Sequence, residues 1–130
     1  TYFSALGESE QKLLLARAIQ MFMPGKPQIW YLDLFAGKND HEAVKRAGEG
    51  GHKEINRTNL TGTQIEQALQ TEVVQKQLEL LRFRSTCKAF TEDADIQVQA
   101  EDQKLMIRWN NSDAAAQLDV DFATGNFTIS

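Results

Sequence analysis

The sequence predicts an α+β fold, and three observations lead to that prediction. Apolar residues recur at helical spacing through most of residues 1–90. From Asp95 onward they alternate with polar residues, which is the pattern of strands with one buried face. With 130 residues, 42% of them hydrophobic and 25% charged, the chain can bury a real core. We therefore expect helices around one buried strand in residues 1–90 and a small antiparallel sheet in residues 91–130.

A core helix is predicted between Ser9 and Pro24. Ser9 is a suitable N-cap for the run EQKLLLARAIQMFM, in which Leu13, Ala16 and Ile19 keep one broad face apolar. The Pro-Gly pair that follows should end the helix.

A buried parallel strand is predicted over residues 28–35. The run QIWYLDLF after Pro27 is dense in aromatic and branched residues on both faces, which is typical of a strand covered on both faces. We therefore interpret Trp30 and Tyr31 as core residues rather than as a platform for a sugar ring.

Three further helices are predicted in the middle of the chain. The motif KND can cap the short helix EAVKRAG, which the glycines of GEGG should end. Thr61 and Gln64 form a capping box for QIEQALQ, and Thr71 can cap the longer amphipathic run EVVQKQLELLRFRSTCKAF.

The C-terminal part is predicted to be an antiparallel meander. The runs IQVQA, KLMIRW, QLDVDF and NFTI alternate in polarity, and the turn-prone motifs EDQ, NNSD and ATG separate them. The domain boundary is expected near Phe90.

Charge and cysteine content narrow the function classes. The net charge is −4 and the basic residues are scattered, so we expect neither a nucleic-acid nor a membrane partner. No run approaches the roughly 18 to 20 apolar residues that a membrane span needs. Cys87 is the only cysteine and is expected to be a packed thiol in a reducing compartment, the cytoplasm. A chain that opens at Thr1 inside an aromatic-rich phrase is expected to be a piece of a longer protein.

No cofactor or metal site is expected. His41 and His52 do not have the spacing of paired metal ligands, and the nucleophile, phosphate-loop and dinucleotide motifs are missing. Glu49 and Glu54 share a loop, but a glycosidase pair requires a defined separation across the substrate that loop spacing does not imply.

The loop GEGGHKEINRTNLT, residues 48–61, has two interpretations. Its glycines can supply tight turns while its charged residues are merely solvated. Alternatively, Lys53, Asn56 and Arg57 can bind hydroxyls or a phosphate, because a loop that follows a parallel barrel strand is a usual place for binding residues. Composition leaves both interpretations open.

Four motifs together resemble the sucrose phosphorylase branch of the α-amylase superfamily, glycoside hydrolase family 13. They are TYFSALG, the phrase MFMPGKPQIWY, LFAGKND and the EINR of the loop, and the resemblance runs from Thr1 to about Phe90. It implies that residues 1–90 are the last helices and eighth strand of a (β/α)8 barrel. Residues 91–130 resemble that family's C-terminal domain only in position and class.

The resemblance also implies an activity for a parent protein. Family members are retaining glucoside phosphorylases that use an aspartate nucleophile, a glutamate acid and base, and phosphate as the acceptor, giving α-glucose 1-phosphate. Their catalytic carboxylates would lie upstream of Thr1, so no catalytic residue is assigned here and the chain alone is expected to be inactive.

The resemblance assigns substrate-binding roles to Lys53, Arg57, Asn56 and His52. In the family the loop reads Gly-Arg-Asp-Ile-Asn-Arg-His, and its first arginine reaches glucose hydroxyls; Lys53 occupies that position here. Because a lysine offers a point charge instead of a planar fork, sucrose itself is in doubt. The variant HKEINRTN is similar to the branch that acts on glucosylglycerate or glucosylglycerol.

Two alternatives to a glucoside phosphorylase stay open. The chain could be a stand-alone α+β binding or scaffold domain, or a piece of an α-glucoside hydrolase. Under the barrel reading, a strand over 28–35 with unpaired edges predicts self-association of this piece.

Overall fold

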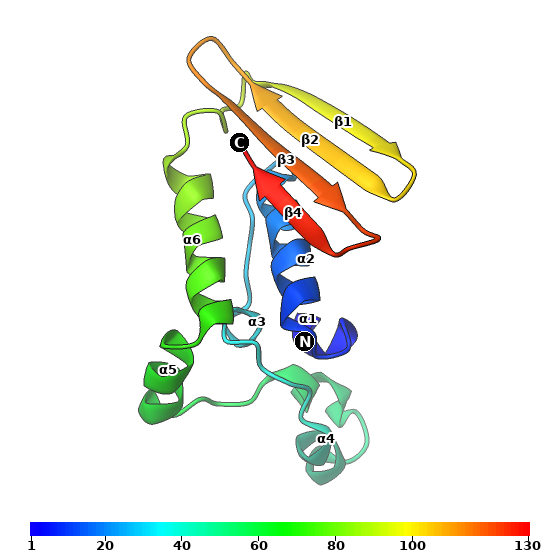
Figure 1. The fold of residues 1–130 in the computed structure, drawn as a ribbon. Coiled ribbons are helices and arrows are strands. Elements are labelled where there is room, and N and C mark those ends of the chain that lie inside the picture. The colour runs from blue at the N-terminus through cyan, green and yellow to red at the C-terminus, as the bar shows by residue number, and fades with distance from the viewer. The chain divides into compact units, whose positions relative to one another are not determined.

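A computed structural model describes all 130 residues, and its element order confirms the predicted α+β class (Figure 1). None of the helices combines the length and the apolar composition that spanning a membrane requires. The helices are α1 (Tyr2–Ala5), α2 (Glu10–Phe22), α3 (Tyr31–Leu34), α4 (His41–Ala47), the 3-10 helix η1 (Gly51–Asn56), α5 (Gly62–Leu69) and α6 (Glu72–Thr86). The strands are β1 (Asp95–Glu101), β2 (Lys104–Asn110), β3 (Ala115–Asp121) and β4 (Asn126–Ile129).

The chain forms two compact units whose division falls inside α2 and α6. Unit 1 comprises residues Thr1–Leu13 and Gln28–Gln77, and unit 2 comprises Leu14–Pro27 and Leu78–Ser130. The predicted boundary near residue 90 concerns the domains of a whole barrel enzyme, and it stays a prediction.

In unit 1, α1 is held against α3 and the segment that follows it. The backbone N–H of Tyr2 donates to Asp33 Oδ1 at 2.7 Å, and the backbone N–H of Asn39 donates to Ser4 Oγ at 2.9 Å. These two bonds join residues more than thirty positions apart in the sequence, so they fix Asp33 and Asn39 relative to α1.

The predicted strand over residues 28–35 is wrong in this structure. Trp30 is extended, with φ −69 and ψ 136, but the chain then enters the helical turn α3, and the carbonyl of Leu34 accepts a hydrogen bond from the buried Gln77 at 2.8 Å. A parallel strand needs a parallel neighbour to complete its hydrogen bonds, and every strand pair in the 130 residues is antiparallel.

Trp30 and Tyr31 are not core residues, contrary to the sequence interpretation. Trp30 is 48% exposed and Tyr31 36% exposed, whereas Leu32 beside them is 1% exposed. A helical turn separates neighbouring side chains by about 100°, so a single apolar residue of the run is directed inward.

Two of the predicted helix caps are confirmed in unit 1. Asp40 Oδ1 accepts the N–H of Ala43 at 2.8 Å at the start of α4. Thr61 and Gln64 form the predicted capping box of α5, with bonds of 3.2 and 2.8 Å. Both interactions lie within four residues of sequence, and this is why they could be predicted.

Unit 2 is organised around an aromatic cluster of Phe22, Phe83, Phe90 and Trp109, with centroid separations from 5.2 to 6.1 Å. The indole N–H of Trp109 donates to the buried carbonyl of Phe22 at 2.8 Å. The bond satisfies a carbonyl at the end of α2 that the helix cannot satisfy itself.

Arg84 of α6 closes one side of this cluster. Its guanidinium lies 4.2 Å from the Phe90 ring centroid and 4.8 Å from that of Trp109, and it donates to the carbonyls of Met21 and Gly25, both at 2.9 Å. Burial lowers the pKa of the Arg84 guanidinium below its ordinary value.

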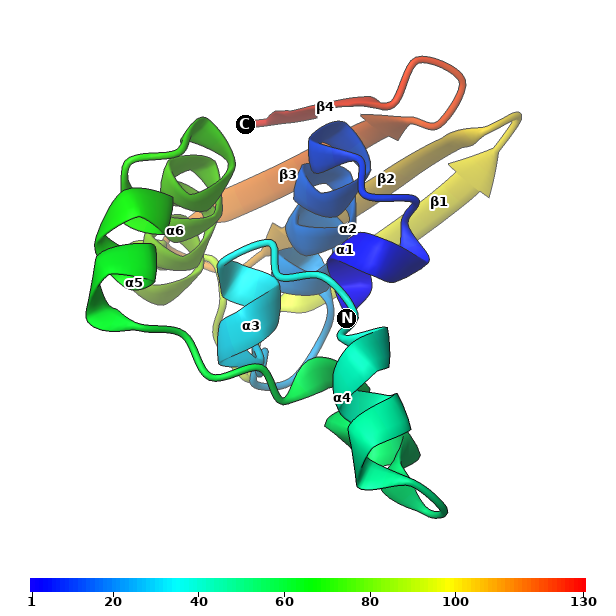
Figure 2. The same cartoon turned by 90° about the horizontal axis from the view of Figure 1, so that it is seen from below.

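The predicted meander is confirmed as a sheet of order β1-β2-β3-β4 with every pair antiparallel. One face is apolar: Ile107, Trp109, Leu118 and Val120 are each at most 4% exposed. β1 and β4 form the two edges of the sheet, as Figure 2 shows from below. The β1–β2 turn, Asp102 and Gln103, has positive φ at both residues, as a tight two-residue hairpin requires.

Candidate functional site

The candidate site is the η1 loop, defined here as residues 48–58, which follows α4. Gly50 has φ 80, in the left-handed region, and a side chain at Gly51 would overlap the side chain of Ala47. These glycines let the chain reverse directly against α4, so that η1 packs beside that helix (Figure 2).

Three hydrogen bonds tie the second half of the η1 loop to residues 30–40. Trp30 Nε1 donates to the carbonyl of Asn56 at 2.9 Å, and the Tyr31 hydroxyl donates to the carbonyl of Thr58 at 2.7 Å. The backbone N–H of Asp40 donates to the carbonyl of Ile55 at 2.8 Å. The exposed aromatic pair therefore holds the loop backbone in place.

Sequence reasoning missed this function of Trp30 and Tyr31. Their rings lie 4.8 Å apart, and each directs its polar atom to a loop that is more than twenty-five residues ahead in the sequence. The one available signal was that both residues combine a large ring with a hydrogen-bond donor, which is typical of side chains that are partly buried and partly exposed to solvent.

His52 and Lys53 are exposed, and neither side chain makes a hydrogen bond or ion pair within the chain. A lysine ammonium has three hydrogen-bond donors, so Lys53 can donate to the hydroxyl or phosphate oxygens of a ligand.

Arg57 and Asn56 each interact with another residue of the chain. Arg57 Nη1 lies 3.3 Å from Glu54 Oε1, and the side chains are 53% and 36% exposed. An exposed pair of this kind stabilises by about 0–1 kcal/mol, so it can open for a ligand at little cost. Asn56 is half-buried, and its main-chain carbonyl is the acceptor of the Trp30 bond.

The predicted site residues do not line the hollow that borders the η1 loop. A hollow of about 490 Å³ next to the loop is formed by Leu32, residues 37–42, Thr58 and Leu60. His52, Lys53, Asn56 and Arg57 lie outside it, on the loop itself.

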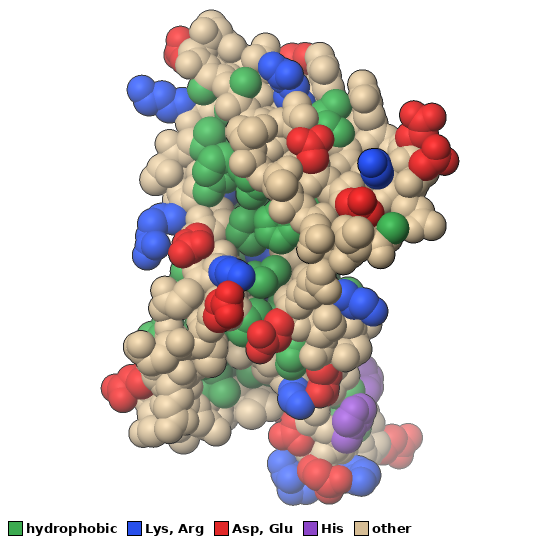
Figure 3. Space-filling view, in the orientation of Figure 1, with side chains coloured by type: hydrophobic (Ala, Val, Ile, Leu, Met, Phe, Trp, Pro, Cys, Tyr) green, Lys and Arg blue, Asp and Glu red, His purple; other side chains and the backbone are tan.

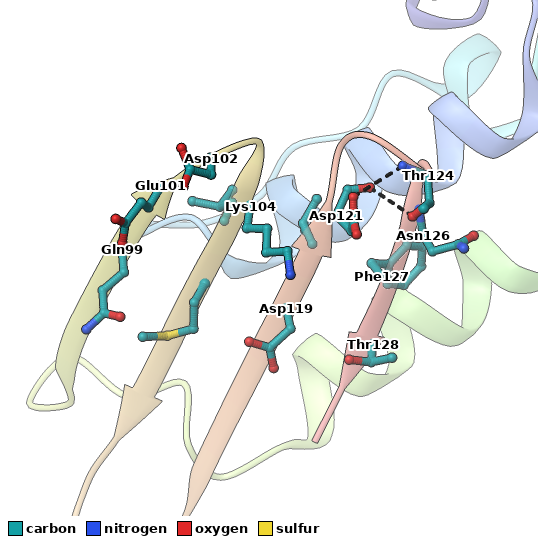
Figure 4. A pocket seen from close by; sticks show the side chains of 13 residues that line it. Gln99, Glu101, Asp102, Lys104, Asp119, Asp121, Thr124, Asn126, Phe127 and Thr128 are labelled. Atoms are coloured by element: carbon teal, nitrogen blue, oxygen red, sulfur yellow. Dashed lines mark hydrogen bonds between the residues drawn. The ribbon is translucent and has the colours of Figure 1, made fainter.

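A second hollow lies on the polar face of the sheet, and Figure 4 shows it. Its acids are Glu101, Asp102, Asp119 and Asp121, and Lys104 extends from β2 toward β3. Asp121 Oδ1 is already used, because it accepts the backbone N–H groups of Ala123 and Thr124 at 2.9 and 3.2 Å. We interpret this hollow as the solvated face of the sheet.

The charges do not single out another site. No group of three or more His, Cys, Asp or Glu residues in the 130 residues is arranged to hold a metal ion. Figure 3 shows acidic and basic side chains interspersed over the face that it displays. The carboxyls whose pKa is lowered, Glu72 by its bond to Lys76 and Asp93 by its bond to Thr91, are both outside the η1 loop.

Comparison with known proteins relates the whole chain to one group of enzymes. No protein-family model matches the chain. It is 54% identical over 129 residues to the sucrose 6(F)-phosphate phosphorylase of Ilumatobacter coccineus, covering 99% of this chain and 24% of that protein. It is 37% identical over 121 residues to the glucosylglycerol phosphorylase of Marinobacter adhaerens, covering 93% of this chain and 25% of that protein.

A solved structure agrees with this relationship. The crystal structure of sucrose 6F-phosphate phosphorylase from Thermoanaerobacter thermosaccharolyticum matches with a TM-score of 0.89 and 42% identity, covering 99% of this chain and 26% of that chain. The chain thus spans about a quarter of the length of the relatives it matches.

Proposed function

The chain is homologous over its whole length to the sucrose phosphorylases, and we propose from this that it is part of a retaining glucoside phosphorylase. The enzyme transfers a glucosyl unit between a sucrose-like α-glucoside and inorganic phosphate, and gives α-glucose 1-phosphate. The observation that carries the proposal is the 54% identity over 99% of the chain.

The proposed reaction is a double displacement with two carboxylates. One carboxylate attacks the anomeric carbon while the second protonates the leaving oxygen; phosphate then attacks the glucosyl-enzyme, and the second carboxylate accepts its proton. We propose that both carboxylates come from the part of the enzyme outside residues 1–130, with this chain in the C-terminal part.

The η1 loop is proposed to contribute to the glucose-binding site. Lys53 would donate hydrogen bonds to glucose hydroxyls, and His52, Asn56 and Arg57 would supply further donors beside it. The support is that Lys53 and His52 are exposed and unengaged on a backbone that Trp30, Tyr31 and Asp40 hold in place. A donor on a fixed backbone loses less freedom on binding than a donor on a mobile loop.

Fructose 6-phosphate is the proposed acceptor in the reverse direction. The relatives with 54% and 43% identity are both named sucrose 6(F)-phosphate phosphorylases, so the phosphate group is on the fructose part of their substrate. A second candidate is glycerol or glycerate. It is favoured by Lys53 in the place of the family's arginine and by the relationship to a glucosylglycerol phosphorylase.

The full-length protein that contains this chain provides the test. It would be incubated with α-glucose 1-phosphate and, separately, with fructose, fructose 6-phosphate, glycerate or glycerol, and released phosphate would be measured. Release with fructose 6-phosphate is the expected result, and release only with glycerol or glycerate would select the second candidate. No phosphate release with any of the four would overturn the proposal.

The same assay separates the alternatives. An α-glucoside hydrolase would give free glucose and no α-glucose 1-phosphate from its glucoside, and a stand-alone binding domain would give neither product. The homology does not favour either alternative.

We also propose that the enzyme works in the cytoplasm and that the chain associates with itself. A single cysteine, Cys87, fits a reducing compartment. Self-association was expected from unpaired edges of residues 28–35, but those residues contain α3 instead of a strand. The proposed self-association would therefore use a surface other than residues 28–35.

A further inference from the structure

Strand β1 is an edge strand that leaves apolar side chains exposed. Val98 is 61% exposed, although it stands opposite Ile107, which is 2% exposed, on the apolar face of the sheet. The strand sequence DIQVQAE contains no lysine and no proline, the residues that usually prevent an edge from pairing with another chain. The middle of β1, residues 96–100, therefore carries no charge that opposes a further strand, and the two acids lie at its ends.

The hairpin geometry determines which backbone groups of β1 face the open edge. The two-residue turn Asp102–Gln103 makes Glu101 and Lys104 the closing pair, whose residues exchange both backbone hydrogen bonds. Hydrogen-bonded and non-hydrogen-bonded pairs alternate from there. The N–H and C=O groups of Ile96, Val98 and Ala100 consequently point away from β2, toward the open edge.

These three residues form a self-complementary set. If two copies of β1 run antiparallel with Val98 opposite Val98, then Ile96 stands opposite Ala100 and Gln97 opposite Gln99. The outward backbone groups of one copy would meet those of the other, so the register that matches the side chains also completes the hydrogen bonds. A two-fold axis through Val98 requires such self-complementarity.

We propose that β1 is the contact between two copies of this protein, paired antiparallel about Val98 into one continuous sheet. The exposed apolar side chains of both copies would then cover each other on one face. On the other face Gln97 would stand opposite Gln99 of the second copy, an uncharged polar pair.

The ends of the strand limit the strength of this contact. The same register places Asp95 opposite Glu101 of the second copy at each end, and like charges directly opposite are unfavourable. A single strand also buries less than the roughly 1,000 Å² of a stable interface. The association is therefore weak and should become stronger when salt screens the acids.

Sedimentation equilibrium of the full-length protein at increasing concentration tests the contact. Val98→Lys places two like charges opposite each other and should weaken dimerisation by roughly tenfold or more, whereas Asp95→Asn should strengthen it. Both side chains are exposed, so both variants should fold. A monomer at all concentrations, or a dimer that Val98→Lys leaves unchanged, would overturn the proposal.

Cross-linking tests the register. In a Cys87→Ser background, Val98→Cys brings two thiols to positions whose Cα atoms are about 5.5 Å apart, a separation that a disulfide spans. Thr128→Cys places an exposed thiol on β4, the opposite edge, and is the matched control. Oxidation should link Val98→Cys copies selectively. Equal linking of both variants would contradict pairing through β1.

Phosphate release tests the proposed activity, and sedimentation and cross-linking test the dimer, so the two proposals are tested by separate measurements. Val98 is not part of the η1 loop, so Val98→Lys should leave activity toward α-glucose 1-phosphate unchanged. A full-length protein without phosphorylase activity can still dimerise through β1, and an active enzyme can be a monomer, so each proposal fails on its own measurement.

Discussion

At the residue scale, Lys53 differs from the other basic residues of the middle segment in having no partner. Lys38, Lys45 and Arg46 lie 2.6, 2.7 and 4.0 Å from acids of their own unit. The ammonium of Lys53 is exposed and makes no ion pair. Its positive charge is therefore available to a ligand.

Lys53→Ala in the full-length enzyme should lower kcat/KM for glucosyl transfer by roughly 10- to 100-fold, because a hydrogen bond from a charged donor contributes about 1.5–3 kcal/mol. Lys45→Ala removes an exposed charge on α4 that is paired with Glu42, and is the control for loss of a lysine outside the loop. If the two variants had the same kinetics as the parent enzyme, the η1 loop would be only structural.

Tyr31→Phe should loosen the η1 loop without removing a side chain that is proposed to bind substrate. The variant loses the 2.7 Å bond to the Thr58 carbonyl and keeps the ring. We expect KM to rise more than kcat falls, and the backbone amide of Asp40, which is bonded to Ile55, to exchange faster with deuterium. Tyr2→Phe changes another exposed tyrosine and should leave that exchange rate as it is.

At the element scale, Arg84 of α6 makes two hydrogen bonds to the end of α2 and the residues just after it. Arg84 donates to two carbonyls, of Met21 and Gly25, and its guanidinium lies over two rings of the aromatic cluster. The planar guanidinium can do both at once, because it donates within its plane while its face contacts the rings.

Arg84→Lys should therefore destabilise the protein by about 1–3 kcal/mol, although the charge is kept, because an ammonium cannot bond both carbonyls and stack. Arg82→Lys, on the same helix at an exposed position, should change stability by less than about 0.5 kcal/mol. Urea unfolding followed by tryptophan fluorescence measures both. Equal stability of the two variants would show that the Arg84 geometry contributes nothing.

At the scale of the whole molecule, the chain contains the η1 loop and an antiparallel sheet, but it spans only about a quarter of the length of its relatives. A chain of residues 1–130 should therefore release no phosphate from α-glucose 1-phosphate with any of the four acceptors, while the full-length protein does. Phosphate release by residues 1–130 alone would place the catalytic carboxylates in this chain and would contradict the proposed division of roles.

The sequence by itself determined the features that depend on neighbours within a few residues. The α+β class, the four strands and the caps at Asp40 and Thr61 follow from periodicity and from side chains that bond backbone groups within one turn. The resemblance of four motifs also identified the sucrose phosphorylases, which whole-length homology confirms.

Only the tertiary structure decided whether residues 28–35 form a strand or a helical turn, and what Trp30 and Tyr31 bind. Buried strands and exposed turns can share one apolar composition, and the outcome depends on whether a parallel neighbour is there to pair. The bonds from Trp30 and Tyr31 to the η1 loop join residues twenty-six and twenty-seven positions apart. No local pattern encodes such a contact, because it exists only once the chain has folded both segments to the same place.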